Sequence, residues 1–302
     1  MKVKSSNWLL GYIALGITWG SSFLFIKWGL LSLSPLGVAF FRGFIGGVTL
    51  IIYSLITKQK FPKKLIEYFH IAVVALFLNS IPSFLFGLGE KHVSSITAGI
   101  LNATTPLMTI LVISIAFREQ KINLNQWIGL LFGFLGVLLV TDVFNNKNSG
   151  SVFGIFVLLL ATLCYGISMP YSRRYVTTLP YSSTALATTQ VCSSVIILLP
   201  FVLSSHILIS SWNLKSTLGM LLLGALGTGF AYIWNYRNVK LAGSTIASTV
   251  TYLTPVVATV LGFLFLKEKL QLIQYLGGVL ILISAALVQG RIKIIRTAKT
   301  SK

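Results

Sequence analysis

The polar side chains of this chain interrupt segments that are otherwise apolar, so each needs a partner or a role. Arg42 is the only cation placed well inside such a segment. A guanidinium there can bind a carboxylate or a phosphate of a substrate. It can equally pair with helix-end carbonyls, or lie in the outer interface and hold its helix in place. Arg42 is therefore a candidate binding residue with a structural alternative.

Aromatic, amide and hydroxyl side chains recur at helical spacing. Asn79, Ser83 and Phe86 are three or four residues apart, so on a helix they share one face. A second such face holds Thr228, Tyr232 and Asn235. Aromatic rings around these faces can wall a cavity for an amphipathic solute, although single rings often face the membrane interface. The predicted substrate-binding residues are Trp19, Ser22, Arg42, Asn79, Ser83, Phe86, Asn102, Thr105, Tyr165, Trp234, Tyr252 and Thr254.

Two prolines, Pro106 and Pro255, lie in the middle of apolar segments and each follows a threonine. Each proline removes one backbone hydrogen bond and frees a carbonyl upstream. In a membrane, a neighbouring group, water or a bound molecule must satisfy that carbonyl. The prolines therefore predict paired helix breaks at a central site, and a kink that serves packing alone is the alternative.

The five acidic residues are placed differently. Glu119 and Glu268 follow basic residues at matching places, and we expect them to pair locally or to cap the following helix. Glu67 begins a segment and Asp142 ends one, so both are expected near the membrane surface. Glu90 is the best-placed acid for binding a proton. No acid falls in the middle of a segment.

Enzyme chemistry finds no support in the sequence. The HExxH, GxSxG and GxxxxGK motifs are absent. The histidines have no nucleophile and acid in register, and Cys164 and Cys192 have neither disulfide nor zinc-site spacing. We therefore expect no catalytic residue, no metal site, no cofactor and no enzymatic activity.

Composition places these residues in a membrane protein. The hydrophobic share is 55% and the charged share only 10%, whereas about a quarter of the residues of a soluble domain are charged. The apolar runs are near the roughly 20 residues that cross a bilayer as a helix. We predict an all-α protein with ten transmembrane helices in the lipid bilayer, at 8–27, 35–57, 67–88, 94–116, 124–142, 151–171, 180–203, 216–235, 243–265 and 272–290.

The net charge of +19 reflects the distribution of lysine and arginine between loops. Of the 24 such residues, seventeen fall at the ends and loops on the side of the N-terminus and six on the other side, with Arg42 inside a span. The positive-inside rule then predicts cytoplasmic N- and C-termini. A nucleic-acid partner is not expected, because no basic helix or soluble domain is present to bind one.

An internal repeat divides the chain. TPLMTILVISIAFRE at 105–119 matches TPVVATVLGFLFLKE at 254–268, and the flanking segments match in nearly the same register. A period near 149 residues predicts five spans in each of two units, 1–145 and 146–302. Because five is odd, the second unit must lie inverted relative to the first. Inverted repeats are typical of secondary transporters that bind substrate between the copies.

The chain resembles the EamA-type branch of the drug/metabolite transporter superfamily over nearly its whole length. The resemblance rests on Trp19–Gly20–Ser21, Phe40–Phe41–Arg42, Thr105–Pro106, Thr254–Pro255, Arg118–Glu119, Lys267–Glu268 and the glycine-bearing segments after them. It implies a carrier of five plus five helices, commonly an exporter of amino acids or related metabolites by alternating access.

The sequence departs from two other branches of the superfamily, and these departures limit the expected cargo. The first span lacks the glutamate of the four-helix multidrug branch, and the later spans lack the basic pair of the sugar-phosphate branches. We therefore expect a plasma-membrane exporter of a neutral or zwitterionic small molecule; the sequence specifies no oligomeric state. A passive pore for small polar solutes and a non-transporting membrane scaffold are the alternatives.

Overall fold

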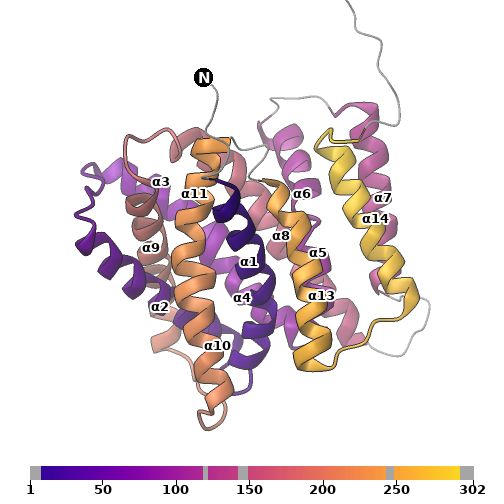
Figure 1. Ribbon diagram of the computed structural model, residues 1–302, viewed down its shortest axis with the longest axis horizontal. Coiled ribbons are helices and arrows are strands. Elements are labelled where there is room, and N and C mark those ends of the chain that lie inside the picture. Colours follow the sequence, from indigo (N-terminus) through magenta and orange to yellow (C-terminus); the bar gives the residue numbers. More distant parts are fainter. Residues whose placement is uncertain (1–7, 118–121, 142–148, 243–247, 293–302) are drawn as a thin grey trace, which may run out of the picture.

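The computed structural model describes residues 8–117, 122–141, 149–242 and 248–292. This part of the chain is helical and contains no strand; a single antiparallel bridge joins Leu33 to Leu208. The helices stand side by side as a bundle (Figure 1).

Residues 8–141 contain seven α-helices and two π-helical turns in their described part. They are α1 (Leu9–Gly29), α2 (Pro35–Ile56), α3 (Leu65–Ala75), the π-turn η1 (Leu76–Ser80), α4 (Ile81–Glu90), α5 (Ser95–Asn102), α6 (Thr105–Val112), the π-turn η2 (Ile113–Phe117) and α7 (Leu124–Thr141).

The described residues after 148 form α8 (Ser149–Tyr175), α9 (Ser183–Leu203), α10 (Leu214–Gly224), the π-turn η4 (Ala225–Phe230), α11 (Ala231–Ala242), the 3-10 turn η5 (Ser248–Tyr252), α13 (Leu253–Leu266) and α14 (Leu272–Val288).

Seven helical segments are long and apolar enough to cross a membrane, and three shorter apolar helices accompany them in the described residues. The shorter helices are Leu124–Val140, Val250–Leu266 and Leu272–Val288. They correspond to the fifth, ninth and tenth spans predicted from the sequence. Helix α14 ends two residues before the tenth prediction does, and the fifth and ninth predictions extend into residues outside the described part. The chain is a multi-pass, all-helical membrane protein.

Short polar residues begin several helices. Ser34 and Ser182 cap α2 and α9, and each hydroxyl accepts a hydrogen bond from the backbone amide three residues on. Ser94 caps α5 and Asn213 caps α10 in the same way. Such caps satisfy backbone donors that the first turn of a helix leaves free.

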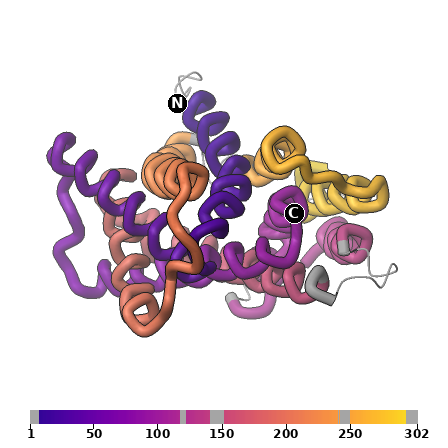
Figure 2. The backbone as a smooth tube through the Cα atoms, turned by 90° about the horizontal axis from the view of Figure 1, so that it is seen from below, coloured from indigo at the N-terminus to yellow at the C-terminus, as the bar shows by residue number. Residues whose placement is uncertain are grey.

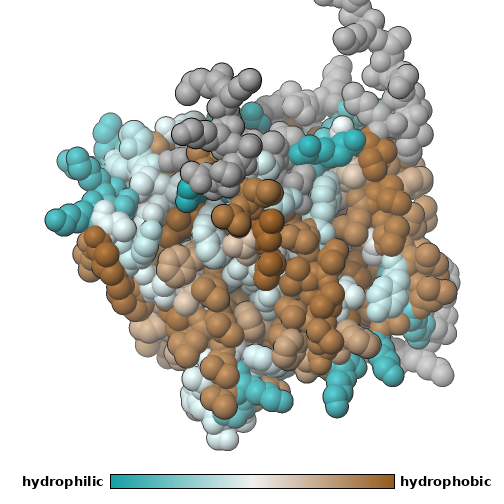
Figure 3. Space-filling view, in the orientation of Figure 1, coloured by the Kyte–Doolittle hydropathy of each residue, from teal (hydrophilic) through white to brown (hydrophobic). Residues whose placement is uncertain are grey.

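The outer surface is suited to lipid. Large apolar side chains are exposed along the helices, among them Leu10, Leu55, Ile196, Phe201 and Leu264. In the space-filling view, hydrophobic residues form a broad band, and hydrophilic residues gather toward the two ends of the helices (Figure 3). An apolar band of this kind needs a bilayer rather than water around it.

Helix α1 lies at the centre of the packing. It contacts α10, α11 and η4 on one side and α5, α13 and η5 on another. Helices α7 and α14 lie against each other at one end of the long axis, and α2, α3 and α9 lie at the opposite end; Figures 1 and 2 agree on this arrangement.

The contact between α7 and α14 is reciprocal. Gln126 Nε2 donates to the backbone oxygen of Val288 at 3.3 Å, and Gln274 Nε2 donates to that of Val140 at 3.3 Å. Each glutamine lies near the start of its helix and each carbonyl near the end of the other, so the helices run antiparallel. Gln274 and Val288 each follow their counterparts by 148 positions.

Glycine allows these two helices to approach closely. A Cβ added to Gly277 would lie 2.7 Å from the backbone oxygen of Gly136, whereas a Cβ at Gly47 in α2 would meet its nearest neighbour, Cys192 Sγ, at an ordinary 3.6 Å. We expect Gly277→Ala to lower the free energy of unfolding by about 1–3 kcal/mol relative to Gly47→Ala, because backbone cannot move aside as a side chain can. Thermal unfolding in detergent measures the difference, and equal stability of the two variants would rule out the tight contact.

Candidate functional site

Two π-helical turns interrupt long helical segments at related places. Turn η1 separates α3 from α4, and η4 separates α10 from α11. The first residue of η4, Ala225, follows the first residue of η1, Leu76, by 149 positions. A π-turn leaves backbone groups outside the regular hydrogen-bond ladder and is common at functional sites.

Each π-turn is joined by a buried polar contact to a helix from the other part of the chain. Arg42 on α2 donates from Nε to Thr228 Oγ1 in η4 at 3.1 Å. Gln190 on α9 donates from Nε2 to Asn79 Oδ1 in η1 at 2.5 Å. Gln190 lies 148 positions after Arg42, and Thr228 lies 149 after Asn79. The two contacts are therefore counterparts, one with a cation and one without.

The neutral contact extends into a hydrogen-bonded chain. Tyr236 on α11 donates from its hydroxyl to Gln190 Oε1 at 2.5 Å, and Tyr232 donates to the Leu78 carbonyl of η1 at 3.3 Å. Gln190 is 0% exposed. The sequence analysis did not predict Gln190 or Tyr236. Gln190 could have been found, because it lies one repeat period after Arg42.

Arg42 is buried, with 9% of its surface exposed, and the bond to Thr228 is the one hydrogen bond of its guanidinium among the described residues. A guanidinium has five N–H donors. Its charge acts on the phenols of Tyr165 and Tyr232, so it lies within electrostatic range of both. Arg42 is therefore a buried cation with donors to spare, flanked by aromatic residues.

Three of the predicted aromatic residues, Trp19, Phe86 and Tyr165, take part in two ring contacts. Trp19 on α1 packs edge-on against Tyr232, with ring centroids 6.1 Å apart. Phe86 on α4 stacks on Tyr165 of α8 at 5.8 Å. Each contact joins a helix from the first 141 residues to one that follows residue 148.

A second set of polar contacts joins α5 to α13. Asn102 at the end of α5 donates from Nδ2 to Thr254 Oγ1 on α13 at 3.5 Å, and the Thr105 hydroxyl donates to the Asn102 carbonyl at 2.8 Å. The structure has a helix boundary just before Pro106, where α5 ends and α6 begins, and another before Pro255, where η5 gives way to α13.

The remaining predicted residues are spread around these groups. Ser22 donates to the Thr18 carbonyl of its own helix, and Ser83 is buried at the start of α4. Trp234 packs with the apolar group around Leu15, on the N-terminal part of α1. Trp234 shares this group with Trp19. The hydroxyl of Tyr252 is buried and has no hydrogen-bond partner among the described residues.

The carboxylate of Glu268 caps a helix distant in sequence. It accepts hydrogen bonds from Ser95 N at 2.9 Å, Ser95 Oγ at 2.8 Å and Ile96 N at 3.1 Å, at the start of α5. The expectation of local pairing or capping of the following helix was wrong for Glu268, because the fold places the start of α5 beside the turn after α13. Glu119 and Asp142 lie outside the described residues.

Glu67 behaves as a local cap at the membrane surface. Its Oε2 accepts from the amides of Lys63 and Lys64 at 3.2 Å and from the Tyr181 hydroxyl at 2.9 Å. That hydrogen bond raises the pKa of the Tyr181 phenol, because ionising it would place two negative charges together.

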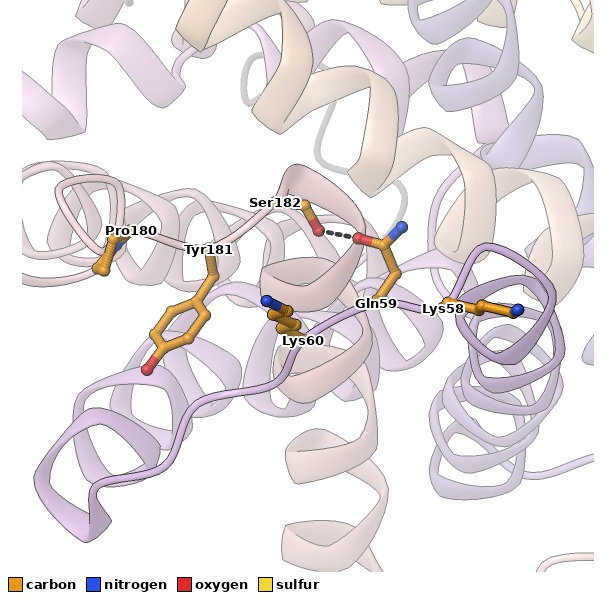
Figure 4. A pocket seen from close by; sticks show the side chains of 6 residues that line it. All are labelled: Lys58, Gln59, Lys60, Pro180, Tyr181 and Ser182. Atoms are coloured by element: carbon orange, nitrogen blue, oxygen red, sulfur yellow. Dashed lines mark hydrogen bonds between the residues drawn. The ribbon is translucent and has the colours of Figure 1, made fainter.

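A cavity of about 330 Å³ opens at this same end of the bundle. It lies between the end of α2 and the start of α9, and Ser182 donates to the Gln59 side chain across it (Figure 4). Its lining residues are Lys58, Gln59, Lys60, Pro180, Tyr181 and Ser182. None of them is a residue predicted to bind substrate.

The residues around Arg42 are suited to binding a molecule. A buried guanidinium, amides, hydroxyls and aromatic faces can hold a small molecule with a carboxylate and an amphipathic body. Among the described residues, no three histidine, cysteine or acidic side chains gather in a way that could hold a metal ion.

Known proteins with similar sequences are transporters. The chain is 26% identical over 284 residues to the uncharacterized transporter YdfC of Bacillus subtilis, covering 92% of this chain and 90% of that protein. It is 28% identical to the uncharacterized inner membrane transporter YedA of Escherichia coli, covering 91% and 88%. A solved crystal structure aligns over 96% of this chain and 99% of its own, with a TM-score of 0.66 at 17% identity, which supports the fold alone.

The sequence profile of the EamA-like transporter family matches the chain twice, over residues 6–142 and 152–289. The two matches leave only the ends and a short connection uncovered. This chain therefore belongs to the EamA-like transporter family, within the drug/metabolite transporter superfamily.

Proposed function

We propose that this protein is a secondary transporter that exports small metabolites such as amino acids by alternating access at a central site. The observation that carries the proposal is the pair of buried contacts Arg42–Thr228 and Asn79–Gln190. Each joins a helix from one matched half to a π-turn of the other, so relative movement of the halves must rearrange both.

The architecture we propose is two inverted five-helix repeats, residues 1–145 and 146–302. The antiparallel, reciprocal contact of α7 with α14 supports inversion. Helices α2 and α9 pack antiparallel as well, with Ser54 near the end of α2 bonded to Thr188 near the start of α9 at 2.8 Å. Two similar halves provide two packings of similar energy, one open to each side.

The proposed cargo is zwitterionic, with a carboxylate bound by Arg42. A buried guanidinium with free donors favours a planar carboxylate, and the aromatic contacts at Trp19 and Phe86 supply apolar walls. We place the carrier in the plasma membrane, since the relative YedA is an inner membrane protein. Both termini are placed in the cytoplasm, because most lysines and arginines lie on that side.

Counterflow tests this function. Proteoliposomes holding the purified chain would be preloaded with an unlabelled amino-acid mixture and then given labelled amino acids one at a time. We expect preloading to accelerate the entry of one amino acid, with saturation at high concentration, because a carrier returns faster when loaded. Entry that is unsaturable and unaffected by preloading would favour a pore, and no entry of any amino acid would remove amino acids as cargo.

A further inference from the structure

Glu90 is a buried acid that the proposed binding site does not use. It is the last residue of α4, and its side chain is 0% exposed. Within the part of the chain that the structure describes, neither Oε1 nor Oε2 has a hydrogen-bond partner. It lies four residues after Phe86, on the helical face that also carries Ser83 and Asn79. The row of predicted binding residues on this face therefore extends to Glu90 at the end of α4.

The charged and titratable groups around Glu90 are Lys91 and His92, which follow it directly, and residues of three other elements. Lys27 on α1 donates its amine to the backbone oxygen of Glu90 and to that of Val93 at 2.7 Å, so it caps the C-terminal end of α4. Lys27, Arg42 on α2 and Glu268 after α13 all act electrostatically on the Glu90 carboxyl. The other elements packed against α4 are η1 and α5, which hold no titratable residue, and α8, whose nearest such residues are Cys164 and Tyr165.

A carboxylate in this position is costly unless something is bound to it. Removing an ion from water costs several kcal/mol when its hydrogen bonds are not replaced. Two cations nearby compensate part of this cost, whereas binding a proton removes the charge altogether. Burial favours the protonated carboxyl, whereas the nearby cations favour the ionised one. A change in the hydration of Glu90 as the bundle opens can therefore shift the balance between these two forms.

The other acids in the described residues already accept hydrogen bonds from protein groups. Glu67 accepts three hydrogen bonds at the surface, and Glu268 accepts three from α5. Glu90 is poorly placed to bind a metal cation, since Lys27 and Arg42 would repel that cation. A proton instead forms an O–H bond and neutralises the carboxyl.

We propose that Glu90 is the proton-binding carboxyl that couples the proton gradient to export, which rests on the function proposed above. The carboxylate takes a proton from water when its end of the bundle opens outward. It releases the proton to the cytoplasm when the bundle opens inward, and cargo leaves in exchange. Lys27 is a positioning residue that fixes the end of α4 on which Glu90 stands.

Accumulation driven by a pH difference tests the coupling. Proteoliposomes with the wild-type chain, an interior one pH unit more acidic than the medium and the membrane potential held at zero should accumulate the amino acid identified by counterflow about tenfold, as one-for-one exchange with protons predicts. Glu90→Gln should lose this accumulation and keep counterflow at equal pH, because exchange of cargo for cargo needs no net proton movement. Glu67→Gln, a matched change at a surface acid, should retain both.

The outcomes separate the coupling from the transport function. Accumulation by Glu90→Gln equal to that of the wild type would refute the role of Glu90 while leaving the carrier intact. Wild-type accumulation that follows a sodium gradient at equal pH would do the same. A chain without counterflow would instead contradict the proposed function.

A measurement without cargo decides the proton site independently. The C=O stretch of a protonated carboxyl is visible by infrared spectroscopy, and we expect one band, in addition to those of the other carboxyls, to appear as the pH is lowered in the wild type and in Glu67→Gln. The band should be missing from Glu90→Gln. Identical infrared titrations of the wild type and Glu90→Gln would show that Glu90 exchanges no proton.

Discussion

Replacing Arg42 with glutamine should reduce counterflow by about 30-fold or more while the chain still folds. The guanidinium is buried, and its one described hydrogen bond uses Nε, so its other donors remain for a carboxylate of the cargo. Losing one partner of a buried, hydrogen-bonded charge pair costs about 2–5 kcal/mol. Initial rates of labelled amino-acid entry into preloaded proteoliposomes measure the loss.

Three further variants separate binding from structure. Arg42→Lys keeps the charge but loses the planar fork, so we expect partial activity. Thr228→Val removes the acceptor that orients Nε and should cost about tenfold, in line with about 1–3 kcal/mol for a buried donor left unpaired. Arg173→Gln removes an exposed arginine from the last turn of α8 and should change little. Wild-type rates in a well-folded Arg42→Gln protein would identify Arg42 as a helix anchor instead.

The membrane class and the family were predictable because they depend on local properties of the sequence. Apolar runs, loop charges and a repeated Thr-Pro segment are visible without the fold. Several site residues were also predictable, since Arg42 and Asn79 are polar side chains inside apolar segments, where each such group needs a reason. Hydropathy placed the end of the tenth span two residues beyond Val288, the last residue of α14, since it does not register where a helix ends.

The rest of the site depends on contacts between distant segments. Gln190 is one polar residue in an ordinary-looking segment until the fold sets it against Asn79. The π-turns η1 and η4 leave no mark in residue spacing, because a single extra residue in one turn hardly alters a helical pattern. The positions of Trp234 and Tyr252 also depended on the fold, which packs Trp234 in the apolar group around Leu15 and buries the hydroxyl of Tyr252.

The acid Glu268 shows how a long-range contact carries stability, and Glu268→Ala should lower the free energy of unfolding by about 3 kcal/mol. Its carboxylate accepts three hydrogen bonds at the start of α5, where Ser95 and Ile96 are buried. Removing it leaves two backbone donors unsatisfied away from water, and hydrogen bonds to a charged group contribute about 1.5–3 kcal/mol each without being additive. Thermal or denaturant unfolding in detergent, followed by tryptophan fluorescence, measures the loss.

Glu67→Ala provides the matched comparison, because Glu67 also caps a helix through backbone amides but does so at the exposed start of α3. Water can replace a lost cap there, so we expect a cost of about 1 kcal/mol. Glu268→Gln should fall between the two, since an amide oxygen can still accept from Ser95 or Ile96 without the charge that favours a helix N-terminus. Equal stability of Glu67→Ala and Glu268→Ala would mean that water reaches the start of α5. In that case the Glu268 contact would not hold the turn after α13 to the start of α5, and the two segments would be free to separate as the bundle opens.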